Sequence, residues 1–282
     1  MKPSWLKVKA PGRGGKMEGI LARHRVHTVC QFARCPNLPV CWGEGTATFM
    51  LLGDVCTRAC RFCSVATGWP AGELDPKEPE KVAQAAKELG LSYVVLTSVD
   101  RDDLPDGGAG QFAATIRALR RELPGAAVEA LIPDFSGRRE ALQEVVEAGP
   151  QVVGHNLETV RRLTGKVRDR RAGYDLSLSV LRALKELSPT LVTKSSLLLG
   201  LGEAEEEVEE ALSDLREARV DIVVLGQYLR PTERQLPVER YVPPKEFAHW
   251  EARARAMGFR GVVAGPLVRT SFRAAQVFSC LR

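Results

Sequence analysis

The chain has 282 residues, of which 27% are charged and 44% hydrophobic, and its formal net charge is +5. These values are ordinary for a globular protein and exclude a disordered or fibrous chain. No apolar run approaches the roughly 20 residues that a membrane span requires, and the first residues lack the apolar stretch of a secretory signal. We therefore expect a soluble, cytoplasmic protein without a membrane partner.

Short β-rich runs alternate with amphipathic stretches along most of the chain. The β-rich runs cover residues 47–52, 93–97, 127–132, 151–153, 191–192, 221–225 and 261–264. The clearest amphipathic stretches cover residues 79–89, 111–123 and 203–218. This alternation predicts βαβ units around a parallel sheet, and six or seven such units fit a complete or partial α/β barrel.

Polar residues follow several of these predicted strands. They occupy positions 97–103, 155–156, 194–196 and 227–228. Barrel enzymes place their chemistry on the loops after the carboxyl ends of the strands, so these residues are expected to meet at one rim. The alternative is that they are ordinary loops, which are polar in any case.

Six of the seven cysteines lie between residues 30 and 63. Cys56, Cys60 and Cys63 follow the first predicted strand, and a second triplet, Cys30, Cys35 and Cys41, precedes it. Reducing compartments disfavour structural disulfides, so this crowding favours metal or redox chemistry. Cys280 fits neither triplet and is expected to be a free thiol near the end of the chain.

Thiolates bind zinc or iron–sulfur clusters, and a cluster held by three cysteines keeps one iron open for substrate. His24 and His27 with Cys35 and Cys41 form an alternative zinc set. A non-catalytic zinc-binding or electron-transfer protein is therefore a competing interpretation.

The Cys-x3-Cys-x2-Cys spacing, with the aromatic Phe62 before Cys63, resembles the radical S-adenosylmethionine superfamily. This resemblance implies a [4Fe-4S] cluster on Cys56, Cys60 and Cys63. It also implies that S-adenosylmethionine binds the open iron and is cleaved to a 5′-deoxyadenosyl radical. The catalytic assignment of the three cysteines follows from it.

The second triplet and its surroundings resemble the lipoyl synthase family over nearly the whole chain. Matching segments cover residues 2–7, 27–30, 41–50, 97–108, 155–160, 168–169, 171–172 and 199–203. The resemblance implies a transferase of lipoate biosynthesis that inserts sulfur at C6 and C8 of an octanoyl group on a carrier lysine. Each insertion would consume one S-adenosylmethionine, and an auxiliary [4Fe-4S] cluster on Cys30, Cys35 and Cys41 would donate its sulfide.

A C-terminal Arg-Ser-Ser-aromatic motif completes the auxiliary cluster in that family. Here the corresponding residues are Arg269, Thr270, Ser271 and Phe272. Ser271 is the fourth ligand if the family uses its second serine, and Thr270 would have to take that role if it uses the first. A hydroxyl is a harder ligand than a thiolate, so this bond should be the labile one. Arg269 is assigned to the catalytic set with Ser271.

The resemblance also implies an architecture and contacts to S-adenosylmethionine. We expect a partial (βα)6-type barrel at residues 46–264, between an N-terminal extension, 1–45, that holds auxiliary ligands and a C-terminal extension, 265–282, that closes their site. The expected cofactor contacts, each of which could instead be an ion pair or a helix cap, are Phe62, Thr97, Ser98, Asp100, Asp103, Asn156 and Lys194.

The implied partners are an octanoylated lipoyl carrier domain, from a 2-oxoacid dehydrogenase subunit or a glycine cleavage H protein, an electron donor such as flavodoxin or ferredoxin, and an iron–sulfur carrier protein.

A radical methylthiotransferase acting on tRNA or protein is the alternative enzyme, but no RNA-binding domain follows the barrel, so no nucleic acid is expected. The basic run at 161–171 is interpreted as a solvated face, with docking of an acidic protein as the sharper possibility.

Overall fold

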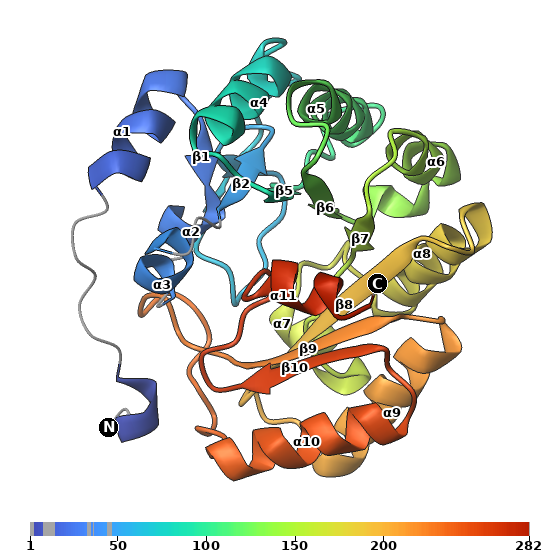
Figure 1. Ribbon diagram of the computed structural model, residues 1–282. Helices are drawn as coiled ribbons and strands as arrows, with labels where there is room; N and C mark the ends of the chain where they lie inside the picture. Colours follow the sequence, from blue (N-terminus) through green and yellow to red (C-terminus); the bar gives the residue numbers. More distant parts are fainter. Residues whose placement is uncertain (1–2, 8–14, 33–34, 36, 44–46, 282) are drawn as a thin grey trace.

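The computed structural model describes residues 3–7, 15–32, 35, 37–43 and 47–281 (Figure 1). The strands are β1 (His27–Thr28), β2 (Thr48–Leu51), β3 (Val55–Cys56), β4 (Ala66–Thr67), β5 (Tyr93–Ser98), β6 (Ala127–Leu131), β7 (Val152–Gly154), β8 (Val192–Leu199), β9 (Ile222–Gln227) and β10 (Gly261–Gly265). The α-helices are α1 (Gly15–His24), α2 (Val29–Phe32), α3 (Leu38–Gly43), α4 (Glu78–Glu88), α5 (Ala109–Glu122), α6 (Arg139–Glu147), α7 (Thr164–Val167), α8 (Tyr174–Leu187), α9 (Glu205–Glu217), α10 (Pro244–Ala256) and α11 (Ala274–Ser279). Three 3₁₀ turns in the same ranges are η1 (Ser4–Leu6), η2 (Phe135–Gly137) and η3 (Arg161–Leu163).

One curved sheet organises the molecule, in the order β1-β2-β5-β6-β7-β8-β9-β10. The strands from β2 to β10 are parallel, and β1 joins the edge antiparallel to β2. Within the described residues β10 pairs with β9 and not with β2, so the sheet forms a partial barrel. This confirms the predicted fold class, with β10 as a seventh parallel strand.

Helices α4, α5, α6, α8, α9 and α10 connect successive parallel strands and surround the sheet on its outer side (Figure 1). Their apolar faces form two buried clusters, one around Phe112, Ile116 and Leu119 and the other around Leu212, Leu215 and Phe247. The strands are rich in β-branched residues because their outer faces are buried under these helices. None of the helices in the described ranges is long and apolar enough to cross a bilayer.

All the predicted strands occur, but β8 is much longer than expected. Residues 194–196 were predicted to lie in a loop at the rim, and this was wrong because they lie inside β8 and are buried. Internal partners of Lys194 and Ser195 allow the burial of their polar side chains. Lys194 Nζ lies 2.7 Å from Glu129 Oε1, and Ser195 Oγ accepts a hydrogen bond from Leu157 N at 3.1 Å.

The C-terminal segment turns back into the barrel after β10. Ala274 and Phe278 of α11 pack against Tyr93, Val95 and Val152 of β5 and β7, and Figure 1 shows α11 lying across the inside of the sheet. Residues 269–271 therefore reach the interior from the side that the sheet leaves open. The predicted C-terminal extension begins where β10 ends, whereas the predicted boundary at residues 45 and 46 lies outside the described residues.

Candidate active site

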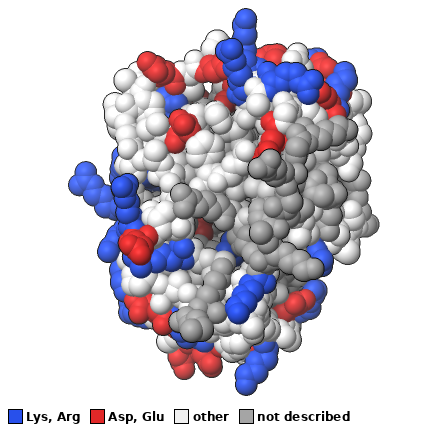
Figure 2. Space-filling model, turned by 90° about the vertical axis from the view of Figure 1, so that its left-hand side faces the viewer, with Lys and Arg blue, Asp and Glu red and all other residues white. Residues whose placement is uncertain are grey.

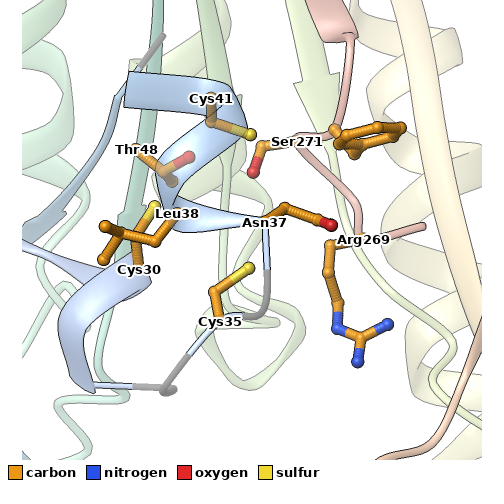
Figure 3. A pocket seen from close by; sticks show the side chains of 9 residues that line it. Cys30, Cys35, Asn37, Leu38, Cys41, Thr48, Arg269 and Ser271 are labelled. Atoms are coloured by element: carbon orange, nitrogen blue, oxygen red, sulfur yellow. The ribbon is translucent and has the colours of Figure 1, made fainter. Parts of the chain in front are cut away.

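A cavity of about 480 Å³ opens at the carboxyl ends of the parallel strands. Its wall includes Cys56, Cys60 and Cys63 together with Cys30 and Cys35 from the other triplet. A smaller pocket beside it is lined by Cys30, Cys35, Cys41 and Ser271 (Figure 3). The first triplet therefore shares the larger cavity with Cys30 and Cys35, at the rim that the sequence predicted for the first triplet, and Cys41 lies in the pocket beside it.

Backbone amides are directed at the sulfur atoms of the first triplet. Arg58 N and Asp100 N donate to Cys56 Sγ at 3.4 and 3.3 Å, and Asp169 N donates to Cys60 Sγ at 3.3 Å. Amide donors of this kind stabilise the negative charge of thiolates and tune iron–sulfur clusters. The loop is therefore arranged to hold anionic sulfur.

Arg58 anchors this loop to the barrel. Its guanidinium is buried and lies 2.6 Å from Asp134, 2.9 Å from Asp102 and 3.3 Å from Asp100. These carboxylates follow β5 and β6, so one side chain ties the cysteine loop to two strand ends. The sequence analysis did not identify Arg58, since its partners are distant in the chain.

Burial also acts on the cysteine thiols. It raises the pKa of the Cys56 and Cys60 thiols to about 12 and that of the Cys30 thiol to about 11. A neutral thiol is a poor ligand, so a bound metal must displace these protons through its own charge. The site fits a strongly binding, highly charged group.

Ser271 lines both the small pocket and the larger cavity, whereas its neighbour Thr270 lines only the larger cavity. Figure 3 shows the Ser271 hydroxyl and the side chain of Cys41 pointing towards each other across the small pocket. Thr270 lines the larger cavity, where its hydroxyl accepts a hydrogen bond from Asn156 Nδ2 at 3.2 Å. The donor set of three thiols and one hydroxyl is complete with Ser271, so the arrangement favours Ser271 over Thr270 as the fourth ligand.

The alternative zinc set is not brought together. His24 Nε2 lies 2.8 Å from Glu88 Oε2 on α4, and the His27 ring packs edge-on against Phe32. In the described residues no three His, Cys, Asp or Glu side chains gather at the spacing of a single metal ion. A cubane cluster takes each ligand at a different iron, so its ligands stand further apart than those of one ion.

Most of the predicted S-adenosylmethionine contacts line the larger cavity: Phe62, Thr97, Ser98, Asp100 and Asn156. Ser98 Oγ and Asn156 Oδ1 are buried and lack a hydrogen-bond partner within the described residues. Buried polar atoms normally have partners, so these two atoms indicate a polar ligand in the cavity. Burial raises the pKa of the Asp100 carboxyl to about 6, against the opposing effect of Arg58.

Asp103 and Lys194 are not brought to the cavity wall. Asp103 lies 2.7 Å from Arg101 and accepts a hydrogen bond from Gly72 N at 2.8 Å, so it fixes a neighbouring loop. Lys194 is paired with Glu129 inside the barrel, as described above. We therefore remove both residues from the expected cofactor contacts.

Two residues that the sequence analysis did not single out, the half-buried Glu158 and the buried Arg168, also line the cavity. Glu158 has the unusual backbone angle φ 68° and accepts a hydrogen bond from Asn156 Nδ2 at 3.0 Å, and burial raises the pKa of its carboxyl. Arg168 donates to Ser177 Oγ at 2.7 Å. A left-handed residue that is not glycine marks a strained position, and such positions concentrate at functional sites.

Arg269 connects the two spaces, because it lines both of them. Burial lowers the pKa of its guanidinium, an effect opposed by the neighbouring Cys35 thiol. Its Nη1 donates to the carbonyl of Val268 at 2.6 Å. A buried guanidinium of this kind is best satisfied by an anion, which a cluster held by thiolates provides.

Comparison with known proteins agrees with this geometry. Residues 50–215 match the radical SAM superfamily. The chain is 59% identical to the lipoyl synthase of Methanocella arvoryzae over 98% of this chain and 94% of that protein. It is 58% identical to the lipoyl synthase of Thermus thermophilus over 98% of this chain and 86% of that protein.

A solved structure of HydG, a maturase of the [FeFe]-hydrogenase, superposes with a TM-score of 0.61 at 15% identity, covering 83% of this chain and 54% of that one. This likeness shows the barrel fold alone. The sequence relatives and the family match go further, and the chain belongs to the lipoyl synthase family within the radical SAM superfamily.

Proposed function

We propose that this protein inserts two sulfur atoms, at C6 and C8, into an octanoyl group carried on a lysine of a lipoyl carrier domain. One observation carries the proposal: two cysteine triplets, each able to hold a cluster, lie close together, one in the cavity at the carboxyl ends of the strands and the other around the small pocket beside it. A single cluster would explain radical formation but not the second set of ligands. Membership of the lipoyl synthase family supports the same reaction.

The residues fit the two clusters by donor chemistry. Cys56, Cys60 and Cys63 would hold the first, and Cys30, Cys35 and Cys41 with Ser271 would hold the second. When bound, the first cluster supplies an electron for cleavage of S-adenosylmethionine, and the second supplies the sulfur.

Other residues of the chain position the S-adenosylmethionine and shape the reaction space. Ser98 and Asn156 offer their unpartnered oxygens to polar groups of this molecule, and Phe62 contributes an apolar wall beside Cys63. Apolar side chains around the cavity, such as Leu131 and Ile132, limit the access of water to it. A radical that abstracts hydrogen from unactivated carbon needs such exclusion, because it would otherwise be quenched by side reactions.

Arg269 and Thr270 occupy the boundary between the two spaces. The Arg269 guanidinium is placed to balance negative charge near Cys35, and Thr270 positions Asn156 by accepting its amide hydrogen bond. The C-terminal segment thus contributes a ligand to one site and a supporting contact to the other. We also propose a cytoplasmic location, an acidic electron donor such as flavodoxin or ferredoxin, and supply of clusters by an iron–sulfur carrier protein.

Anaerobic reconstitution with iron and sulfide tests this function. The reconstituted protein is incubated with S-adenosylmethionine, dithionite and a peptide that carries octanoyl-lysine, and products are measured by mass spectrometry. We expect 5′-deoxyadenosine together with singly and doubly thiolated peptide. Binding of zinc in place of iron, or the absence of 5′-deoxyadenosine, would contradict the proposal.

A further inference from the structure

Three arginines beside the first cysteine loop lack carboxylate partners among the described residues. Arg61, Arg170 and Arg234 are all exposed. Arg61 donates only a long hydrogen bond of 3.5 Å, to the carbonyl of Lys166. We refer to Arg61, Arg170 and Arg234 as the arginine patch. None of the three lines the cavity, whereas the neighbouring Arg230 does.

Other basic residues of this region are neutralised within the molecule. Arg161 lies 2.6 Å from Asp175, Arg162 lies 2.7 Å from Glu207, and Arg171 lies 2.8 Å from Asp169. The basic run that the sequence singled out is therefore largely paired. The charge that remains available to a partner lies on the arginine patch, where Glu233 is the nearest exposed acid in sequence.

Sequence neighbours and backbone hydrogen bonds connect the patch to the cluster ligands. Arg61 follows Cys60, and its backbone joins two other segments, since Arg61 N donates to Val167 O at 2.9 Å and Leu236 N donates to Arg61 O at 3.0 Å. Arg170 follows Asp169, whose amide donates to Cys60 Sγ at 3.3 Å. Arg61 is thus the sequence neighbour of the ligand Cys60, and Arg170 is the neighbour of the residue whose amide contacts the Cys60 sulfur.

We propose that the arginine patch is the docking surface for an acidic protein that donates single electrons to the first cluster. The inference rests on the proposed function, in which each cleavage of S-adenosylmethionine consumes one electron. The donor is oxidised by one electron and the cluster is reduced by one, and no atom is transferred. Electron transfer requires proximity but no opening, which fits a surface that lies beside the cavity and not in its wall.

The carrier domain has a different requirement. Its octanoyl-lysine arm must enter the cavity, so the carrier must bind over an opening. The patch residues do not line the cavity, and carrier and donor can therefore occupy different surfaces. Figure 2 shows a hollow on the face that it draws, with lysine and arginine side chains along its edges. Positive charge on the arginine patch steers an acidic protein towards it and mainly raises the rate of association.

The test uses the reconstituted holoenzyme and an acidic bacterial flavodoxin as the probe. In the double variant Arg61→Glu/Arg170→Glu, we measure the rate of 5′-deoxyadenosine formation with reduced flavodoxin and divide it by the rate with dithionite. We expect this ratio to fall by about tenfold or more at low salt, because electrostatic steering contributes about 10–10³-fold to association. The dissociation constant for oxidised flavodoxin, from an equilibrium titration, should rise in parallel.

The control is Arg117→Glu/Arg182→Glu, which makes the same change in net charge. Both arginines are exposed, on α5 and α8, and form no ion pair within the described residues. Both readouts of the control should match the wild type. The salt dependence of flavodoxin binding should be weaker in the patch variant, since less electrostatic attraction is left for salt to screen.

Wild-type values of both readouts in the patch variant would overturn the proposal. Weaker binding of an octanoylated carrier domain with unchanged binding of flavodoxin would overturn it in favour of a carrier site. Failure of the wild type to form 5′-deoxyadenosine with dithionite would instead contradict the proposed function. The binding titration still tests the patch in that case.

Discussion

The loop of Cys56, Cys60 and Cys63 and the segment of Cys30, Cys35 and Cys41 differ in what holds them in place. The first is fixed by buried ion pairs of Arg58 and by two hydrogen bonds of Thr57, whose backbone amide donates to the carbonyl of Asp100 and whose hydroxyl donates to the carboxylate of Asp102. Such a network has to be broken as a whole before the loop can move. The first cysteine loop is therefore held rigidly in place.

The second triplet is held mainly by local turns within the described residues. Cys35 N donates to Cys30 O at 3.0 Å, and Cys41 N donates to Asn37 O at 2.9 Å. Asn37 Nδ2 reaches the carbonyl of Leu267, which links the triplet to the C-terminal segment that brings Ser271. A cluster that gives up its sulfur must come apart, and a site closed by one hydroxyl ligand suits that task.

The largest expected effect comes from removing Arg58. In Arg58→Met, the carboxylates of Asp100, Asp102 and Asp134 lose the cation they share, and breaking a buried pair in this way costs about 3–5 kcal/mol. We expect a lower free energy of unfolding, measured in urea, and loss of iron from the first site with loss of 5′-deoxyadenosine. Arg117→Met is the matched control on α5. Normal 5′-deoxyadenosine formation in Arg58→Met would contradict the claim that Arg58 fixes the first cysteine loop more firmly than the second triplet is held.

Ser271→Ala tests the other side of the comparison. Mutation of a residue that only hydrogen-bonds to a metal ligand costs up to about 100-fold in activity. Loss of the ligand itself should therefore reduce sulfur insertion by at least about 100-fold. Formation of 5′-deoxyadenosine should continue. The iron bound at the second site is measured in a protein whose first cysteine triplet has been replaced, and there Ser271→Ala should lower the iron content. Thr270→Ser is the control and should keep both activities. The reverse result, with Thr270→Val losing the auxiliary cluster and Ser271→Ala retaining it, would assign the ligand to Thr270.

A smaller effect is expected at the cofactor contacts. Asn156→Ala should raise the KM for S-adenosylmethionine by about tenfold, equal to about 1.4 kcal/mol. Ser98→Ala should raise it less, because a single neutral hydrogen bond contributes about 1 kcal/mol. Lys194→Met should lower the free energy of unfolding without changing this KM, since Lys194 is paired with Glu129. A raised KM in Lys194→Met would return Lys194 to the cofactor contacts.

The sequence predicted the barrel and both triplets because their signals are local. Alternating strands and helices follow from apolar periodicity, and the cysteine ligands lie close together in the chain. Residues 194–196 were misplaced for the opposite reason. Their polarity indicates a loop, and only the partners supplied by Glu129 and Leu157 allow Lys194 and Ser195 to be buried in a strand.

The remaining site residues depend on contacts across the chain. Arg58 is significant because Asp134 follows a different strand, and its sequence neighbourhood carries no sign of this. The choice between Thr270 and Ser271 likewise depends on which way each side chain faces after the chain re-enters the barrel. The polar residues at the strand ends were the only sequence signal that pointed towards these partners.

The division of labour between the two triplets is tested most directly by one pair of variants. Cys60→Ala and Cys35→Ala are reconstituted, mixed with S-adenosylmethionine, dithionite and octanoyl-lysine peptide, and both products are measured in one sample. We expect Cys60→Ala to form neither 5′-deoxyadenosine nor thiolated peptide, and Cys35→Ala to form 5′-deoxyadenosine without thiolated peptide. Thiolated peptide from Cys35→Ala at the wild-type level would contradict the role of the second triplet as the source of sulfur.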